Sequence, residues 1–211
     1  MIRRLSMALA SALLASAASA QPAPEWKAIG APSATVFALA QDPHSPNIFM
    51  AGTYFGGLQR SVDGGFTWQG VASPFDAKVI TAIGYHPTVG GMVYVGTFEG
   101  GLFRTSDGGS TWVTLNTGLT DLNIGAIAVS HTNPSTLIVA TAGGGVLRST
   151  DAGLSWSVVL AVASRVLFAD PRMPGVMLSG APNQLYVSTN DGAAWSVIGQ
   201  PLGESVPSIG I

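Results

Sequence analysis

Short apolar runs alternate with turns rich in glycine, proline and polar residues along most of the chain. Each run is too short for a stable helix, and many contain the β-branched and aromatic residues typical of strands. The runs recur three to a unit. The first of each unit is 36–40, 79–83, 124–129 or 166–168, the second is 48–52, 93–96, 137–140 or 176–180, and the third is 58–60, 102–104, 146–148 or 185–187. The pattern predicts an all-β protein whose strands are joined by hairpins.

A polar turn of eight residues follows the third run of every unit, at 61–68, 105–112, 149–156 and 188–195. A hydroxyl residue opens it, Asp or Asn stands third, glycine fifth and tryptophan eighth. These residues are Ser61, Asp63, Gly65 and Trp68; Thr105, Asp107, Gly109 and Trp112; Ser149, Asp151, Gly153 and Trp156; and Ser188, Asn190, Gly192 and Trp195. Asp and Asn side chains bind nearby backbone amides, and glycine allows the positive φ of a tight turn. We therefore predict a structural role for the motif, with the tryptophan starting a fourth strand and filling the core between units.

The repeat has a period close to that of a propeller blade, because tryptophans 26, 68, 112, 156 and 195 are 42, 44, 44 and 39 residues apart. The motif resembles the Asp-box, or BNR repeat, of β-propeller proteins. The unit from Gly56 to Trp68 is most similar to propellers of the photosystem II stability and assembly factor type, and more distantly to sortilin-type and xyloglucanase-type propellers. The resemblance implies four-stranded antiparallel blades stacked around an axis.

The two ends match parts of further blades. Residues 25–29 align with a fourth strand, and residues 208–211 align with a first strand. We expect about four full blades with partial strands at both ends, as part of a larger ring. A ring of four blades, or pairing with a second chain, is the alternative, so self-association is one expectation for an incomplete ring.

Residues 1–20 have Arg3 and Arg4, an apolar run and a final Ala-Ser-Ala, which predicts a signal peptide cleaved after Ala20. The propeller domain is then 21–211, exported to the periplasm or secreted, with no membrane insertion after cleavage. Without the two arginines, seven basic residues stand against eleven acidic ones, a net charge of about −4. An acidic chain without basic clusters argues against nucleic acid as a partner. The chain has no cysteine, which excludes disulfides, thiolate metal sites and a lipid-bearing cysteine.

Candidate site residues lie where the units differ from one another. In propellers of this strand order the Asp-boxes share one face with the first-to-second turns, and the opposite face carries the second-to-third turns and the connections between blades. On that opposite face we predict a binding site made of Tyr54, Phe55, Phe98, Glu99 and Arg165. Asp76, Glu99 and Asp121 are the candidate catalytic carboxylates of a hydrolase, since glycoside hydrolysis needs two such groups. No metal site and no cofactor are expected.

The resemblance implies a non-enzymatic propeller that binds a protein or peptide, with a glycan as the second class of partner. The alternative is an extracellular glycoside hydrolase of the xyloglucanase or sialidase type. The chain lacks the Arg-Ile-Pro segment of sialidases before the first box. A third interpretation is a structural propeller within a larger surface protein.

Overall fold

The computed structural model describes residues 35–199, which form four sheets of four antiparallel strands, each sheet with its strands in chain order. The signal peptide, the strand around Trp26 and the strand at 208–211 predicted from the sequence lie outside this range. Blade A contains β1 (Val36–Gln41), β2 (Phe49–Thr53), β3 (Leu58–Ser61) and β4 (Gln69–Val71), and blade B contains β5 (Ile80–Tyr85), β6 (Val93–Thr97), β7 (Gly101–Thr105) and β8 (Val113–Thr114). Blade C contains β9 (Ile124–Val129), β10 (Leu137–Thr141), β11 (Gly145–Ser149) and β12 (Ser157–Leu160), and blade D contains β13 (Val166–Ala169), β14 (Met177–Ala181), β15 (Gln184–Ser188) and β16 (Ser196–Ile198).

The predicted all-β class and the four-stranded blades are confirmed, with one difference at the tryptophans. Each fourth strand begins one residue after the tryptophan. The indole Nε1 of Trp68 donates to the carbonyl of Gly65 at 2.9 Å, and Trp195 bonds Gly192 in the same way at 3.1 Å. Because this bond ties the side chain back to the turn, the tryptophan closes the box and the strand starts after it.

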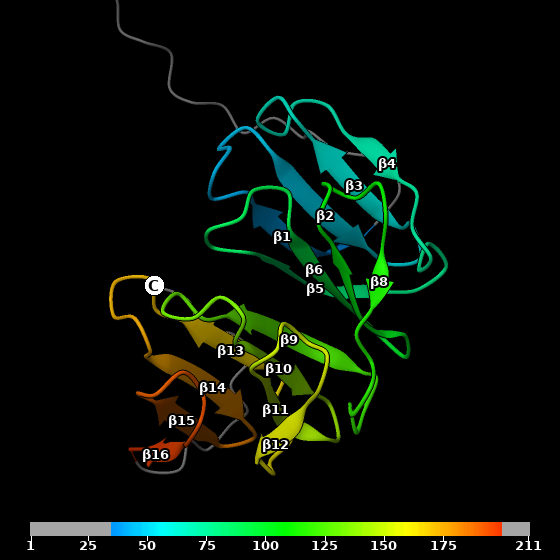
Figure 1. Ribbon diagram of the computed structural model, residues 1–211. Helices are drawn as coiled ribbons and strands as arrows, with labels where there is room; N and C mark the ends of the chain where they lie inside the picture. Colours follow the sequence, from blue (N-terminus) through cyan, green and yellow to red (C-terminus); the bar gives the residue numbers. More distant parts are fainter. Residues whose placement is uncertain (1–34, 200–211) are drawn as a thin grey trace, which may run out of the picture.

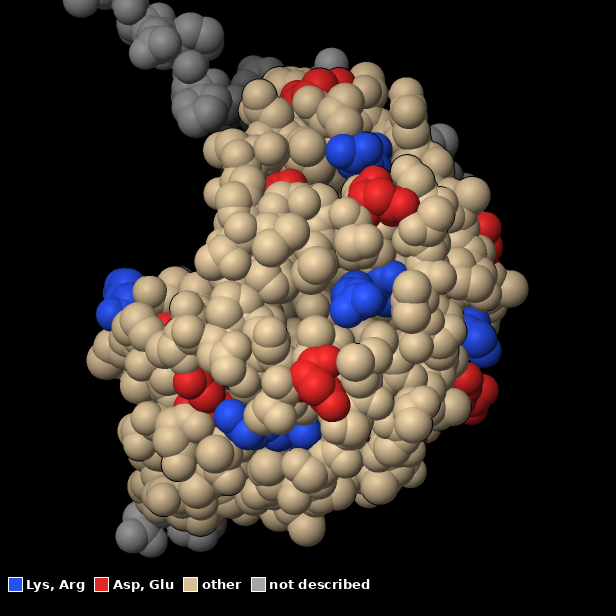
Figure 2. All heavy atoms as spheres, in the orientation of Figure 1, with Lys and Arg blue, Asp and Glu red and all other residues tan. Residues whose placement is uncertain are grey.

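The four blades follow one another along an arc, with their first strands on the inside (Figure 1). β1 packs beside β5, β5 beside β9, and β9 beside β13. These inner strands line a hollow of about 390 Å³, which Ala40, Tyr85, Ala128 and Ala169 help to form. Figure 2 shows the arc as a crescent that is open on one side.

Hydrophobic cores fill the seams between neighbouring blades. Trp112 of blade B packs in a cluster with Met50 of blade A and with Phe75 from the connection between them. Trp156 of blade C packs against Leu115 and donates to its carbonyl at 3.0 Å. Trp195 of blade D packs in the same way on a cluster that contains Ile138 of blade C. The expectation that these tryptophans fill the core between blades is therefore confirmed for these three.

Glycines let the blades approach closely at the seams. A Cβ on Gly52 of β2 would lie 2.2 Å from Cγ2 of Ile80 in the next blade, and one on Gly96 would lie 2.5 Å from Cγ2 of Ile124. A methyl group at either position would overlap its neighbour, so the close packing requires glycine there. Within residues 35–199 there is no helix long and apolar enough to cross a membrane.

Candidate functional site

The Asp-box carboxylates accept hydrogen bonds from residues of their own turns. In the second box, Oδ1 of Asp107 accepts from the hydroxyl of Thr105 at 2.7 Å and from the amide of Thr111 at 2.9 Å. Bonds from the side chain and backbone of Thr111 hold the pKa of Asp107 well below its ordinary value. The same contacts lower the pKa of Asp63 from 3.8 to about 2, with the side-chain bond from Thr67 as the largest cause.

The box turns lie on the same face as the turns between first and second strands. The amide of Gly64 donates to the carbonyl of Asn47 at 2.9 Å, and the amide of Gly108 donates to that of Gly91 at 2.9 Å. Equivalent bonds join the third and fourth boxes to Ser135 and Gly175. We call this the box face. Its predicted composition is confirmed, and its repeated bonds make it a structural face.

The opposite face carries the second-to-third turns and the connections between blades, as predicted, and we call it the loop face. On it the amide of Phe98 donates to the carbonyl of Val79 at 2.9 Å, and the amide of Ala142 donates to that of Asn123 at 3.0 Å. The turns are thereby fixed to the connections. Their side chains differ from blade to blade, which leaves them free to define a site.

An exposed aromatic cluster stands on the loop face of blade A. The rings of Tyr54 and Phe55 meet edge to face with centroids 4.5 Å apart, and Phe37 stacks on Tyr54 at 5.7 Å. All three side chains are more than half exposed. A hollow of about 450 Å³ begins beside Phe55 and extends past Gly57 to Asp76. An open aromatic surface next to a hollow is suited to hold an apolar side chain of a ligand.

Phe37 was not among the binding residues predicted from the sequence, because it falls within a predicted strand. A signal was present, because the equivalent positions in the other blades hold Thr81, Gly125 and Arg165. A large aromatic residue at a position that does not otherwise require one is a departure from the repeat. Tyr54 and Phe55 were predicted as binding residues for the same reason, because they also differ from the equivalent residues of the other blades.

The other predicted binding residues follow the arc on later blades. Phe98 and Glu99 occupy the second-to-third turn of blade B, where both are exposed and Glu99 has a φ of 58°. The backbone amide of Glu99 donates to Oδ1 of Asn123 at 3.0 Å, which fixes this turn to the next connection. Arg165 is exposed at the start of blade D. The structure therefore groups Tyr54 with Phe55, and spreads the remaining three along the loop face.

The three candidate carboxylates have different surroundings. Asp121 accepts from the amide of Gly143 at 2.6 Å and from both nitrogens of Asn123 at 2.9 Å. Burial opposes ionisation of Asp121, but these bonds outweigh it and lower the pKa. Asp76 accepts from the hydroxyl of Ser73. Asn123 thus links the carboxylate of Asp121 to the backbone of Glu99, whereas Asp76 belongs to the hollow on blade A.

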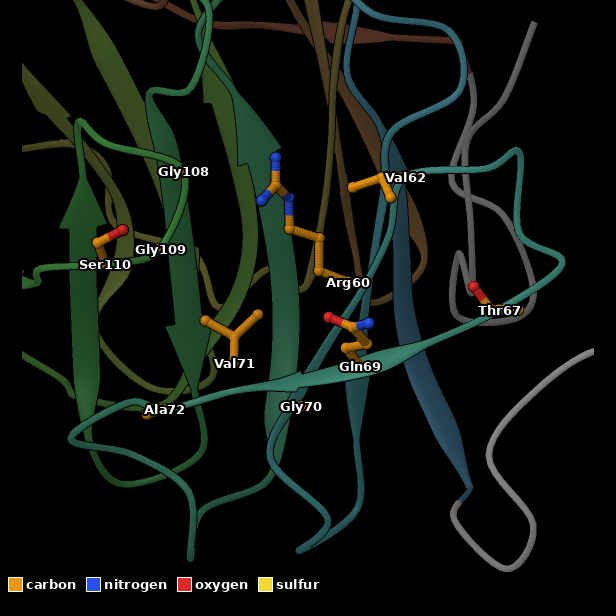
Figure 3. A pocket seen from close by; sticks show the side chains of 10 residues that line it. All are labelled: Arg60, Val62, Thr67, Gln69, Gly70, Val71, Ala72, Gly108, Gly109 and Ser110. Carbon is orange, nitrogen blue, oxygen red and sulfur yellow. The ribbon is translucent and has the colours of Figure 1, made fainter.

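A third hollow, of about 340 Å³, lies on the box-face side of the seam between blades A and B (Figure 3). The side chain of Arg60 extends from β3 toward the turn at Gly108, with Val62 on its other side. Its Nε is buried and has no hydrogen-bond partner. In blade C the equivalent Arg148 donates from Nε to the carbonyl of Asp191 at 2.8 Å. Of these two arginines, only Arg148 bonds to the next box turn, and its partner there is a backbone carbonyl.

Charged side chains do not form a patch of a single sign on the side of the molecule seen in Figure 2. On the side seen in Figure 2, basic and acidic groups are few and interspersed. No group of three His, Cys, Asp or Glu side chains in the described range could hold a metal ion. The buried His86 accepts from the amides of Thr88 and Val89 at Nδ1, so it caps its own turn.

Comparison with known proteins gives one family and several structures of the same fold. The Sortilin-Vps10 family profile, described as sortilin, neurotensin receptor 3, matches residues 56–178. YCF48 from Cyanidioschyzon merolae is 16% identical with a TM-score of 0.65, over 88% of this chain and 63% of that chain. YCF48 bound to D1 peptide is 17% identical with a TM-score of 0.66, over 90% and 61%. A comparison with curated protein sequences finds no match.

The structures also include GH74 enzymes. The enzyme from Niastella koreensis is 23% identical with a TM-score of 0.60, over 75% of this chain and 28% of that chain. An ancestral GH74 enzyme is 21% identical with a TM-score of 0.60, over 77% and 25%. The chain therefore spans about a quarter of the length of these enzymes. At these identities the likeness shows a shared propeller fold.

Proposed function

Since the chain belongs to the Sortilin-Vps10 family of Asp-box propellers, we propose that it is a non-enzymatic binding protein that holds an extended peptide segment of a protein partner on its loop face. The observation that carries the proposal is the exposed cluster of Phe37, Tyr54 and Phe55 beside the hollow that ends at Asp76. Exposed aromatic residues in one place are what protein and peptide interfaces use as anchors. A structure of the fold relative YCF48 with a D1 peptide supports the choice of a peptide.

The chemistry of the cluster indicates how such a peptide would bind. The three rings would cover an apolar or aromatic side chain, and the hollow would take the neighbouring part of the peptide. Asp76, which is exposed at the end of the hollow, would accept a hydrogen bond from a peptide amide or a basic side chain. We further propose that the protein acts outside the cytoplasm, because residues 1–20 have the composition of a signal peptide.

The test is selection of random peptides displayed on phage, followed by measurement of the affinity of a selected peptide. Replacing Tyr54 and Phe55 together by Ala should weaken binding by roughly tenfold or more, as loss of a central aromatic anchor does. Phe66→Ala is the matched control, since Phe66 is an exposed aromatic residue of the first box turn. Equal affinities for the double variant and the wild type would contradict the proposal.

Glycoside hydrolysis is the second candidate, because Asn123 holds the carboxylate of Asp121 next to the turn of Glu99. With its pKa lowered, Asp121 would serve as base or nucleophile, and Glu99 would have to supply the proton. Incubation with xyloglucan distinguishes the two functions. Release of reducing ends that is lost in Glu99→Gln would establish the hydrolase, whereas binding without release would favour the peptide-binding protein.

A further inference from the structure

The turns between first and second strands have the same construction in all four blades. The backbone amide of the first turn residue donates to the carbonyl six positions further on, at 2.9–3.0 Å. The side chain of that first residue accepts a hydrogen bond from the amide two positions further on. The four residues are Asp42, His86, Ser130 and Asp170. Each is at most 7% exposed, so a buried acceptor caps every one of these turns.

The cap of blade B differs from the other three in its chemistry. Nδ1 of His86 accepts from the amides of Thr88 at 3.2 Å and Val89 at 3.0 Å. A ring nitrogen accepts only when it carries no hydrogen, so these bonds require the neutral imidazole with its hydrogen on Nε2. A carboxyl or hydroxyl oxygen, as at the other three caps, accepts hydrogen bonds in every protonation state. Histidine changes its protonation state between about pH 5 and pH 8, so the cap of blade B alone responds to pH in that range.

The turn that His86 caps also supports the second box. The carbonyl of Gly91 in this turn accepts from the amide of Gly108 at 2.9 Å, and a Cβ on Gly91 would lie 3.5 Å from the same nitrogen. Residues 108–110 help to line the hollow that contains the side chain of Arg60 (Figure 3). Loss of the cap would therefore loosen the second box and one wall of this hollow.

We infer that His86 is a pH-sensitive cap that keeps the first-to-second turn and the box of blade B closed at neutral pH and releases them in acid. When a proton from solvent binds Nδ1, the nitrogen becomes a donor, and the amides of Thr88 and Val89 lose their acceptor. The turns of the other blades keep their caps, so the opening is confined to blade B. This inference does not depend on the proposed function.

The surroundings of the ring favour its neutral form. Burial is the larger cause that lowers the pKa of His86 from 6.5, and the charge of His44 is the smaller one. His44 belongs to the equivalent turn of blade A, where its Nδ1 lies 3.5 Å from Oδ1 of Asp42. Other titratable or charged side chains on the surrounding elements are Arg60, Tyr85, Tyr94, Arg104, Asp107 and His131. Because the folded pKa is below the unfolded one, the cap contributes stability that is present above about pH 6.5 and is lost as the pH falls through the folded pKa.

The experiment is hydrogen exchange of the amides of Thr88 and Val89, followed by NMR from about pH 8 to about pH 5. His86→Asp is the matched variant, because Asp caps the same turn in blades A and D. In the wild type the protection factors of both amides should fall by up to about tenfold for each pH unit below about 6.5, until the folded pKa is reached. They should stay constant in His86→Asp. Equal pH dependence in the two proteins would overturn the inference.

Two box amides in the same experiment test whether the opening reaches the second box. Gly108 donates to the carbonyl of Gly91, and Ala152 donates to that of Ser135 in blade C, each at 2.9 Å. The protection factor of Gly108 should fall together with that of Val89, whereas that of Ala152 should stay constant because Ser130 caps its turn. A constant value at Gly108, or an equal fall at Ala152, would overturn a release confined to blade B.

NMR of the ring nitrogens measures the titration of His86 directly. Nδ1 should carry no proton at neutral pH and should gain one over the range in which Thr88 and Val89 lose protection. His44→Gln is the control for the neighbouring ring, and the titration of His86 should persist in that variant. A His86 ring that stays neutral down to the pH at which the whole protein unfolds would overturn the inference.

Discussion

At the scale of single residues, the box turn depends on a hydrogen-bond acceptor at its third position more than on a charge. Asp63, Asp107 and Asp151 accept from the opening hydroxyl residue and from an amide four positions further on. Asn190 accepts the same two bonds, from the hydroxyl of Ser188 and the amide of Ala194, each at 2.9 Å. The amide oxygen therefore satisfies the turn as a carboxylate does, and the charge adds a dependence on pH.

Two substitutions of Asp151 distinguish the contribution of its hydrogen-bond acceptor to stability from that of its negative charge. Asp151→Asn should lower the melting temperature less than Asp151→Ala, because only Ala leaves the donors of Ser149 and Ser155 unsatisfied. The bond from Ser149 is the largest cause that lowers the pKa of Asp151 from 3.8 to about 2. A depressed pKa contributes stability above the unfolded value, and this is lost as the pH falls from 3.8 through about 2.

The measurement is thermal unfolding of the wild type and Asp151→Asn from neutral pH to about pH 2. The stability of the wild type relative to Asp151→Asn should fall across the acid range, because the Asn side chain does not titrate there. A difference that stays constant with pH would show that the carboxylate charge does not contribute to folding.

The repeated arginines give a matched pair at the same scale. Arg148→Met should cost about 1–3 kcal/mol of unfolding free energy, because the carbonyl of Asp191 loses its donor. Arg60→Met should cost less, since the buried Nε of Arg60 has no partner to lose. Methionine retains an unbranched apolar side chain in both variants, so that the comparison tests the loss of the guanidinium group. Urea unfolding measures both, and a larger loss for Arg60→Met would mean that its guanidinium makes a stabilising interaction of its own.

At the scale of the strand and blade, close approach at the seams is set by glycines in the second strands. These glycines have no space for a side chain, since the first residue of the next blade occupies it. Glycine in a strand ordinarily weakens it, so its use in β2 and β6 indicates that seam packing outweighs strand propensity. The seam is therefore the unit of stability, more than any single sheet.

Gly52→Ala should destabilise the protein by about 1–3 kcal/mol, because the added methyl group would overlap Ile80. Gly70→Ala is the control, since the nearest atom to a Cβ there is Nε2 of Gln59 at 3.8 Å and β4 is an outermost strand. Chemical unfolding of the two variants checks the comparison. If both substitutions had the same small effect, close packing at the A/B seam would not limit stability.

At the scale of the whole molecule, blades B and C each pack against two neighbouring blades within residues 35–199, and blades A and D each pack against one. All five residues of the second strands β6 and β10 are buried, whereas the second strands β2 and β14 each have one half-buried residue. In repeat proteins stability is close to a sum over units and their interfaces. With one described seam fewer, blades A and D are expected to open at a lower cost than blades B and C.

Hydrogen exchange should show this gradient. Amides of β6 and β10 should exchange slowest, and those of β14 and β15 should exchange faster although they are also paired on both sides within their sheet. Uniform exchange across the four blades would instead indicate a single cooperative unit.

Most of the architecture could be predicted because its signals are local. The box turn is completed within eight residues, so Asp63, Gly65 and Trp68 identify it wherever they recur. The strand order within a blade predicted which turns lie on which face. The prediction that the boxes and the second-to-third turns lie on opposite faces is confirmed. For the candidate site, the sequence pointed to Tyr54 and Phe55 as departures from the repeat, and their role in binding remains a prediction.

The sequence by itself determined the blade, its four strands, the box turns and the order of the units, because each depends on residues close together in the chain. Only the tertiary structure decided that Phe37 joins Tyr54, that Arg148 finds a carbonyl while Arg60 does not, and that Val36 is exposed where Ile80 is buried. These outcomes depend on which blade, if any, lies against a residue. Contacts between blades join positions about one repeat apart, and equivalent residues in a repeat can have different neighbours there.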